Sequence, residues 1–179
     1  MSSDLVQFPP PPPTRQIYLI GFRLDPGAEQ PQFYTLMGDE GESERPITRE
    51  GRILFFRRPS DARKALRQSD NGFADLTKVP HEMEMLCDVS SALYVANAEE
   101  SDAEGVLFEL IAVFDDLLRA IRMNVPEEHA GLLGAVAQRL AQNPEFVSVL
   151  EARKAGRDKL EDALMWCVGA VAVKSSFVE

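Results

Sequence analysis

Cysteine, histidine and tryptophan are scarce in this chain of 179 residues, which holds two cysteines, two histidines and one tryptophan. The cysteines, Cys87 and Cys167, lie far apart, lack a CxxC spacing and have apolar neighbours, so we interpret both as buried thiols. A single disulfide between them stays open, but two cysteines do not make the disulfide framework of a small secreted domain. The sequence therefore predicts a protein of the reducing cytoplasm.

The scarcity of histidine also limits the metal and catalytic chemistry. Neither His81 nor His129 stands in an HExxH or ExxH pattern, and two thiols are too few for a cysteine-built zinc site. The GxSxG, P-loop and GxGxxG patterns are missing too, so the familiar hydrolase, nucleotide and dinucleotide classes lack support. We expect no metal, no cofactor and no catalytic residue. A noncatalytic protein is favoured, while an enzyme without a local signature stays open.

No stretch of the sequence has the apolar length of a membrane span, because even residues 106–121 include Glu109, Asp115 and Asp116. The first residues lack the basic region and apolar run of a signal peptide. The chain has 19 Lys and Arg residues against 29 Asp and Glu residues, a formal net charge of −10. This charge argues against non-specific affinity for nucleic acid or anionic membranes. We therefore expect neither a membrane nor a nucleic acid as partner.

Proline is concentrated near the N-terminus, where residues 9–13 are five consecutive prolines. Such a run favours polyproline II and cannot enter a helix or a central strand, so residues 1–14 are predicted to form a disordered arm. Phe8 followed by these prolines resembles the Phe-Pro-Pro-Pro-Pro ligand of EVH1 domains, which dock it in an aromatic-lined groove. Gln7 and Thr14-Arg15 stand where such ligands commonly carry acids. A stiff spacer is the alternative interpretation.

The region after the arm is rich in β-branched and aromatic residues. Residues 17–24, 33–38 and 52–57 are predicted strands, the first two an antiparallel pair, with a polar loop over 39–46. Pro59 begins a short helix whose buried stripe is Ala62, Ala65 and Leu66. Residues 83–87 alternate imperfectly and are a weaker strand prediction. Asp88 is expected to cap a helix over residues 89–98.

Helical spacing dominates the second half of the sequence. It predicts helices over residues 102–123, 126–143 and 145–171, the last with a break near Gly156 and with Trp166 as a core anchor. Strands first and helices later indicate an α+β fold, an N-terminal antiparallel sheet with a short β-α unit and a C-terminal helical bundle. We predict a single domain over 15–179, rich in strands over 15–88 and helical over 89–179.

Charge is distributed unevenly along the chain. Residues 45–67 carry eight bases and two acids, whereas residues 79–118 carry ten acids and no base. Such segments commonly cover solvated faces or neutralise each other, but a concentrated acidic surface also steers a basic partner protein. The partner-binding residues predicted from this segment are Glu99, Glu100, Asp102, Glu104, Glu109 and Asp116.

Three hypotheses about function follow. The favoured one is a noncatalytic protein–protein interaction module that presents the acidic surface to a basic partner. The first alternative is an enzyme or small-anion-binding protein that uses the arginine-rich junction between a strand and a helix. Its predicted anion-binding residues are Arg52, Arg57, Arg58, Arg63 and Lys64. The second alternative is an oligomeric structural protein that associates through its helical half.

Overall fold

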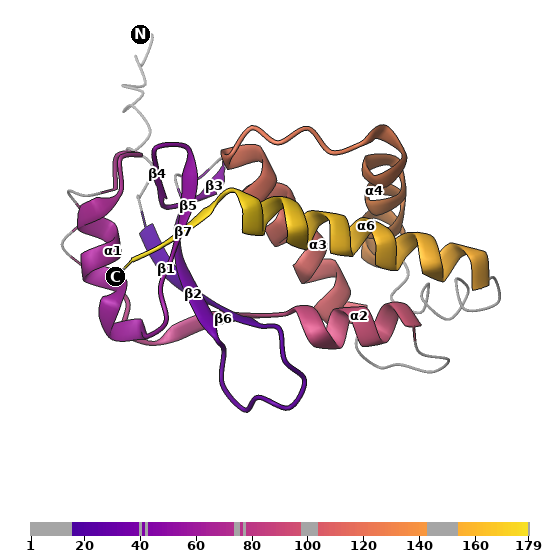
Figure 1. The fold of residues 1–179 in the computed structure, drawn as a ribbon, viewed down its shortest axis with the longest axis horizontal. Coiled ribbons are helices and arrows are strands. Elements are labelled where there is room, and N and C mark those ends of the chain that lie inside the picture. The colour runs from indigo at the N-terminus through magenta and orange to yellow at the C-terminus, as the bar shows by residue number, and fades with distance from the viewer. Residues whose placement is uncertain are drawn as a thin grey trace, which may run out of the picture.

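The computed structural model describes residues 16–39, 41, 43–73, 76, 78–97, 104–142 and 154–178. These residues form an α+β fold, which confirms the predicted class, with the strands gathered on one side and the long helices on the other (Figure 1). The predicted arm over 1–14, the start of the helix predicted from residue 102 and the first part of the one predicted from 145 lie outside the described residues.

A four-stranded sheet forms the centre of the strand-rich half, in the order β3-β2-β1-β6. Strands β1 (Gln16–Arg23) and β2 (Phe33–Asp39) pair antiparallel, as predicted, and β3 (Glu44–Pro46) continues the antiparallel order. Strand β6 (Met83–Asp88) confirms the weaker strand prediction, but it runs parallel to β1. The sheet is therefore mixed, because the chain crosses over through a helix before it returns to β1.

A second sheet has the order β4-β5-β7 and was not expected as a separate sheet. Strands β4 (Thr48–Arg49) and β5 (Arg52–Phe55) form a tight antiparallel hairpin. Strand β7 (Ser175–Phe177) comes from the far end of the chain and pairs parallel with β5. A bridge between Tyr34 and Phe56 joins the two sheets, so the last strand of the sequence becomes part of the strand-rich half.

The helices agree with the predicted ones over most of their length. A 3-10 turn, η1 (Pro59–Asp61), leads into α1 (Ala62–Gln68), and α2 (Val89–Asn97) follows β6 directly. The long helices are α3 (Glu104–Ala120), α4 (Glu127–Gln142) and α6 (Lys154–Val173). Helix α6 runs through Gly156, since a single glycine costs a helix only about 1 kcal/mol, while residues 143–153, over which the predicted break near Gly156 could also fall, lie outside the described residues.

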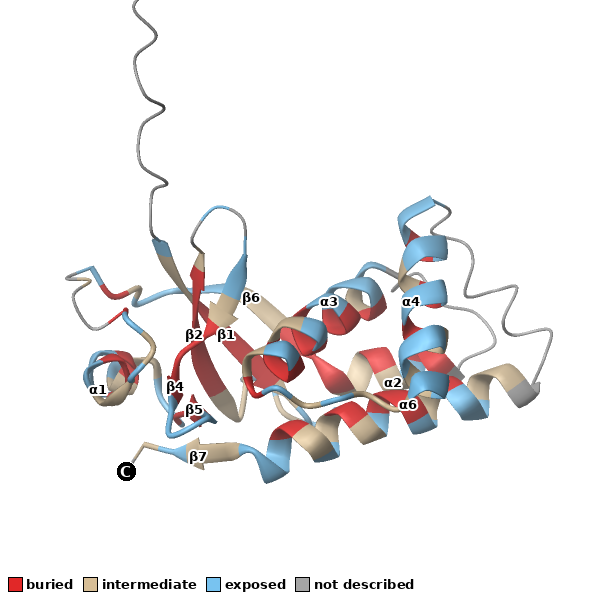
Figure 2. Cartoon of the chain, turned by 90° about the horizontal axis from the view of Figure 1, so that it is seen from above, coloured by how far each residue is buried: buried red, intermediate tan, exposed pale blue. Residues whose placement is uncertain are grey.

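Two apolar cores lie on opposite faces of the central sheet. The larger one fills the space between this sheet and helices α2, α3, α4 and α6, and the smaller one lies beneath α1. Neighbouring residues of β1 alternate between them, Leu19 in the smaller core and Ile20 in the larger. Figure 2 shows the buried residues along these inner faces. Cys87 and Cys167 are both buried free thiols in the larger core, as predicted.

Trp166 is half-buried and packs against the larger core, in agreement with its predicted role as an anchor. No helix within the described ranges combines the length and the apolar character needed to cross a bilayer.

Candidate binding site

An apolar cavity of about 230 Å³ opens where the strand-rich half meets the helices. The end of β1, the start of β2, β5 and β7 supply one part of its wall, and α2, α3 and α6 supply the other. Its lining is apolar except for one serine, and consists of Phe22, Leu24, Phe33, Phe55, Val89, Phe114, Val168, Val171, Ala172, Ser175 and Phe177. The cavity therefore offers an aromatic and aliphatic surface with almost no polar group.

Four phenylalanines build a rigid floor and an open mouth. The rings of Phe22 and Phe55 meet edge to face with their centroids 5.3 Å apart, and both side chains are buried. Phe177 packs against Phe33 at 5.2 Å and against Phe55 at 6.2 Å, yet 49% of it stays exposed. Leu24, which also lines the cavity, is 43% exposed. These exposed apolar side chains mark the mouth as a surface suited to contact with another molecule.

Strand β7 borders the cavity and forms an edge of its sheet. The amide of Ile53 donates to the carbonyl of Lys174 at 2.9 Å, and the amide of Val178 donates to the carbonyl of Phe55 at 2.8 Å. Residues 174, 176 and 178 thus face β5, so Ser175 and Phe177 direct their amides and carbonyls outward. Figure 2 places β7 at the margin of the ribbon, with its outer edge toward solvent.

The rim of the cavity next to β7 is cationic. The guanidinium of Arg57 lies over the exposed ring of Phe177, 6.0 Å from its centroid. At the other end of β7, Arg52 donates to the carbonyl of Val173 at 3.2 Å and to that of Ser175 at 3.4 Å. Lys174, the residue before β7, is also exposed. This local positive charge contrasts with the acidic chain as a whole.

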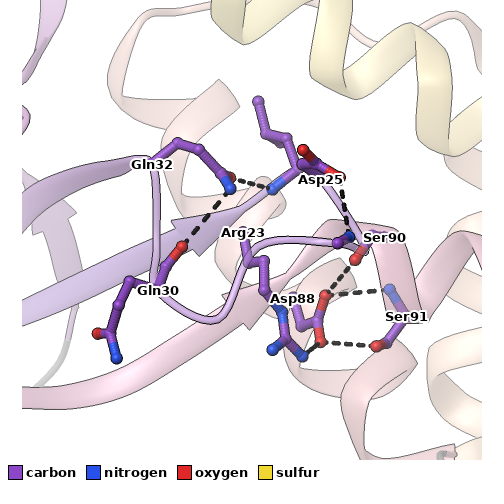
Figure 3. A network of polar contacts seen from close by, with 9 residues as sticks. Arg23, Asp25, Gln30, Gln32, Asp88, Ser90 and Ser91 are labelled. Atoms are coloured by element: carbon purple, nitrogen blue, oxygen red, sulfur yellow. Dashed lines mark hydrogen bonds and ion pairs between the residues drawn. The ribbon is translucent and has the colours of Figure 1, made fainter.

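A partly buried polar network fixes the lip where β1 ends and α2 begins (Figure 3). Asp88 accepts hydrogen bonds from the Ser91 amide at 3.0 Å, the Ser90 hydroxyl at 2.8 Å and the Ser91 hydroxyl at 2.6 Å, and it pairs with Arg23. Burial alone would raise the pKa of Asp88, but the bonds from Arg23, Ser91 and Ser90 outweigh it and hold this pKa well below its usual range. The predicted cap of the helix over 89–98 is confirmed.

The same network positions three residues of the cavity wall. Arg23 stands between Phe22 and Leu24, and Asp88 precedes Val89, so the Arg23–Asp88 pair ties β1 to the start of α2. The amide of Leu24 also donates to the Gln32 side chain at 2.7 Å, which holds the turn that follows β1. We assign these polar residues a positioning role, because none of them lines the cavity.

The predicted acidic surface is only partly visible in the structure. Glu99, Glu100 and Asp102 lie outside the described residues, and Glu104 begins α3. Glu109 is exposed on that helix, whereas Asp116 is half-buried and paired with Arg119 at 3.1 Å. Burial raises the pKa of Asp116, and the charges of Glu44 and Asp115 add to this shift against the opposing charge of Arg119. Glu44 of β3 therefore lies close to Asp116 of α3, a proximity that the sequence did not predict.

Tyr18 lies within this acidic group. Its hydroxyl donates to Glu44, and burial together with the charges of Glu44, Asp116 and Asp39 raises the pKa of the phenol. Glu44 of β3 thus pairs with Tyr18, whereas Asp115 and Asp116 of α3 pair with Arg119 of the same helix.

The predicted anion-binding residues do not converge on one point. Arg52 and Arg57 flank β7, whereas Arg58 pairs with Asp61 at 3.3 Å. Arg63 and Lys64 are exposed on α1, and Arg63 lines an open depression with His81, Glu82 and Glu84. In this depression the basic segment meets the acidic one, as the mutual neutralisation of the two segments would require.

A second apolar cavity, of about 380 Å³, lies between α3, α4 and α6. Residues 143–153, between α4 and α6, lie outside the described residues. The cavity beside β7 is therefore the better defined candidate site.

Sequence analysis did not predict this site. The aromatic and β-branched residues of the three predicted strands were interpreted only as sheet formers, and the residues at 175–177 were not predicted as a strand. The one available signal was Phe177-Val178, an apolar pair left over after the last predicted helix.

Comparison with known proteins supports the fold and leaves the function open. No family model and no curated protein sequence matches the chain. A solved structure, the crystal structure of the SatS C-terminal domain in complex with bromine, is similar to it with a TM-score of 0.57. The two share 14% sequence identity over 92% of this chain and 94% of the other. At this identity the likeness establishes a shared fold alone.

Proposed function

We propose that this chain is a noncatalytic protein-interaction module that takes a large apolar side chain of a partner polypeptide into the cavity beside β7. The observation that carries the proposal is a cavity of about 230 Å³ with a buried aromatic floor and an exposed apolar mouth. Sites for drug-sized ligands and cofactors usually measure about 300–1,000 Å³. A smaller apolar cavity suits a single anchoring side chain of the kind that dominates protein interfaces.

The chemistry of the lining favours binding over catalysis. Among the described residues that line the cavity none is titratable, and the hydroxyl of Ser175 donates to the carbonyl of Val171 at 2.6 Å. The two thiols lie elsewhere in the core, where burial raises the pKa of Cys87 and raises that of Cys167 to about 11. Neither is a nucleophile at neutral pH. An acidic surface for a basic partner, predicted from residues 79–118, stays a prediction.

The proposal is tested with N-acetyl-phenylalaninamide as a probe for the cavity. In a titration followed by methyl NMR, we expect shifts concentrated at Val168, Val171 and Ala172, all of which line the cavity. N-acetyl-glycinamide, which lacks the side chain, should leave these methyl groups unchanged.

A matched pair of variants locates the binding. Ala172 lies exposed at the cavity wall, whereas Ala135 is exposed on α4 and does not line it. Ala172→Trp should fill the mouth and abolish the response at Val168 and Val171, and Ala135→Trp should preserve it. Equal responses in both variants, or no response in the wild type up to the solubility of the probe, would overturn the proposal.

A further inference from the structure

We infer that the partner segment is an acidic, extended peptide that adds as a strand to the outer edge of β7 and places one large apolar side chain in the cavity. This inference rests on the proposed function and names the chemistry of its ligand. Three observations carry it: the open edge of β7, the alternation of its side chains and the charge of its rim.

The edge of β7 is available for backbone pairing. Its inner edge is bonded to β5 through residues 174, 176 and 178. On the outer edge, the carbonyl of Ser175 accepts a hydrogen bond from the side chain of Arg52. Among the described residues, none bonds to the outward amide or carbonyl of Phe177. An edge strand with open backbone groups is the platform on which extended peptides add a further strand.

The side chains of β7 align this edge with the cavity. Ser175 and Phe177 both line the cavity, as expected for residues two apart on a strand. A strand added to β7 would lie about 4.8 Å away and carry alternate side chains on the same face. One of these side chains would stand beside the mouth formed by Leu24 and Phe177, so strand pairing and side-chain capture require a single peptide conformation.

The charge of the rim selects an acidic peptide. Arg52 and Lys174 lie at the start of β7 and Arg57 lies at its end, and all three are exposed. Bases at both ends of a short strand favour carboxylates on either side of the apolar anchor and disfavour a basic peptide. The charge of the rim thus selects an acidic peptide, the open edge of β7 selects an extended backbone, and the volume of the cavity selects one large apolar side chain.

The test measures the fluorescence anisotropy of a fluorescein-labelled peptide, Asp-Glu-Thr-Phe-Thr-Glu-Asp, with the full chain. Two analogues carry backbone N-methyl groups, one on both threonines and the other on the phenylalanine and both glutamates. The two sets of amides face opposite edges of an extended strand, so only one set can donate to β7. We expect one analogue to bind at least tenfold more weakly than the parent and the other to bind within threefold of it.

Charge is tested with Lys-Lys-Thr-Phe-Thr-Lys-Lys and with Arg57→Glu, which should each weaken binding at least tenfold at low salt. Arg67→Glu on α1 is the matched control, because Arg67 is an exposed base that neither lines the cavity nor belongs to the β7 sheet, and the change should leave affinity unchanged. Equal or tighter binding of the lysine peptide would overturn the acidic ligand.

The outcomes separate this inference from the proposed function. If both N-methyl analogues bind like the parent, or both lose binding equally, strand addition is overturned, while a response of the cavity to N-acetyl-phenylalaninamide leaves the proposed function standing. If the parent peptide binds Ala172→Trp as well as Ala135→Trp, its binding bypasses the cavity and this inference fails, while the titration with N-acetyl-phenylalaninamide decides the proposed function separately.

Discussion

Asp88 combines a helix cap with a partly buried ion pair at the lip of the cavity. Its carboxylate is nearly inaccessible, yet every bond it accepts comes from a donor of the β1 end or the first turn of α2. A cap is worth about 0.5–2 kcal/mol, and hydrogen bonds to a charged group about 1.5–3 kcal/mol. The residue therefore stabilises the site without contacting a ligand.

This arrangement predicts a pH-dependent contribution to stability. The pKa of Asp88 is lowered in the folded state, so its contribution is complete above the unfolded pKa of about 3.9 and is lost as pH falls through the folded pKa. Asp88→Asn keeps a capping side chain but loses the ion pair with Arg23. We expect it to lower the free energy of unfolding by about 1–3 kcal/mol at neutral pH, measured by urea denaturation.

The difference between wild type and Asp88→Asn should shrink when the same measurement is repeated in steps below about pH 4. A difference that is constant across this pH range would show that the carboxylate charge is not what stabilises the fold.

The limits of sequence reasoning at this scale are visible in two residues. The cap at Asp88 could be predicted because a helix start is a local pattern of a few residues. The need for glycine at position 38 could not be predicted, because it arises from a contact with a distant part of the chain. A Cβ at this position would come 2.1 Å from the ring of Phe73. Contacts between distant segments, like the Arg23–Asp88 pair, leave no local signature.

At the scale of elements, the β4–β5 hairpin shows how a turn can be improved. Glu50 and Gly51 both have positive φ, 54° and 70°, between the paired residues Arg49 and Arg52. A two-residue turn of this kind favours Asn-Gly, since asparagine tolerates the left-handed region better than glutamate does. The backbone of Glu50 is therefore strained in a hairpin whose second strand, β5, pairs with β7.

Glu50→Asn is expected to raise the free energy of unfolding by about 0.5 kcal/mol, because it relieves the left-handed backbone without changing a buried contact. Gly51→Ala should act in the opposite direction by about 1 kcal/mol, because alanine is strained at that φ. Urea denaturation of the two variants checks both signs. A loss of stability in Glu50→Asn would show that the glutamate side chain has a stabilising contact of its own.

Elements whose apolar pattern repeats over several turns were predictable, whereas the three-residue strands were not. Helix α3 and helix α4 carry apolar faces over several turns, so their spacing identified them. Strands β3 and β7 have three residues each, too few to show alternation, and they depend on partners already in the sheet. Because β7 forms the edge next to the cavity, the candidate site could not be predicted without this strand.

At the scale of the whole molecule, the larger core joins both halves of the chain. It includes Ile20 and Phe22 of the central sheet, Phe55 of the second sheet and buried residues from each long helix. Strand β7 adds a backbone link between the C-terminal end of α6 and β5. The α+β order of elements follows from local patterns and could be read from the sequence. The junction that forms the cavity depends on contacts between distant segments, so it could not be read in this way.

This shared core predicts that the strand-rich and helical parts unfold as one unit, in line with the single domain expected from the sequence. Cys87 lies in β6 and Cys167 in α6, and both are buried in the larger core. Each thiol can react with iodoacetamide only when its surroundings open, so its alkylation rate in native buffer, divided by the rate in urea, measures a local opening equilibrium.

We expect the two opening free energies, followed by peptide mass spectrometry at early times, to agree within about 1 kcal/mol with each other and with the global free energy of unfolding. Cys87→Ala, read at Cys167, controls for any effect of modifying one thiol on the other. Faster opening at Cys167 alone would instead mean that α6 separates from the sheet before global unfolding. Since α6 supplies one wall of the cavity and leads into β7, such an opening would also disassemble the binding site.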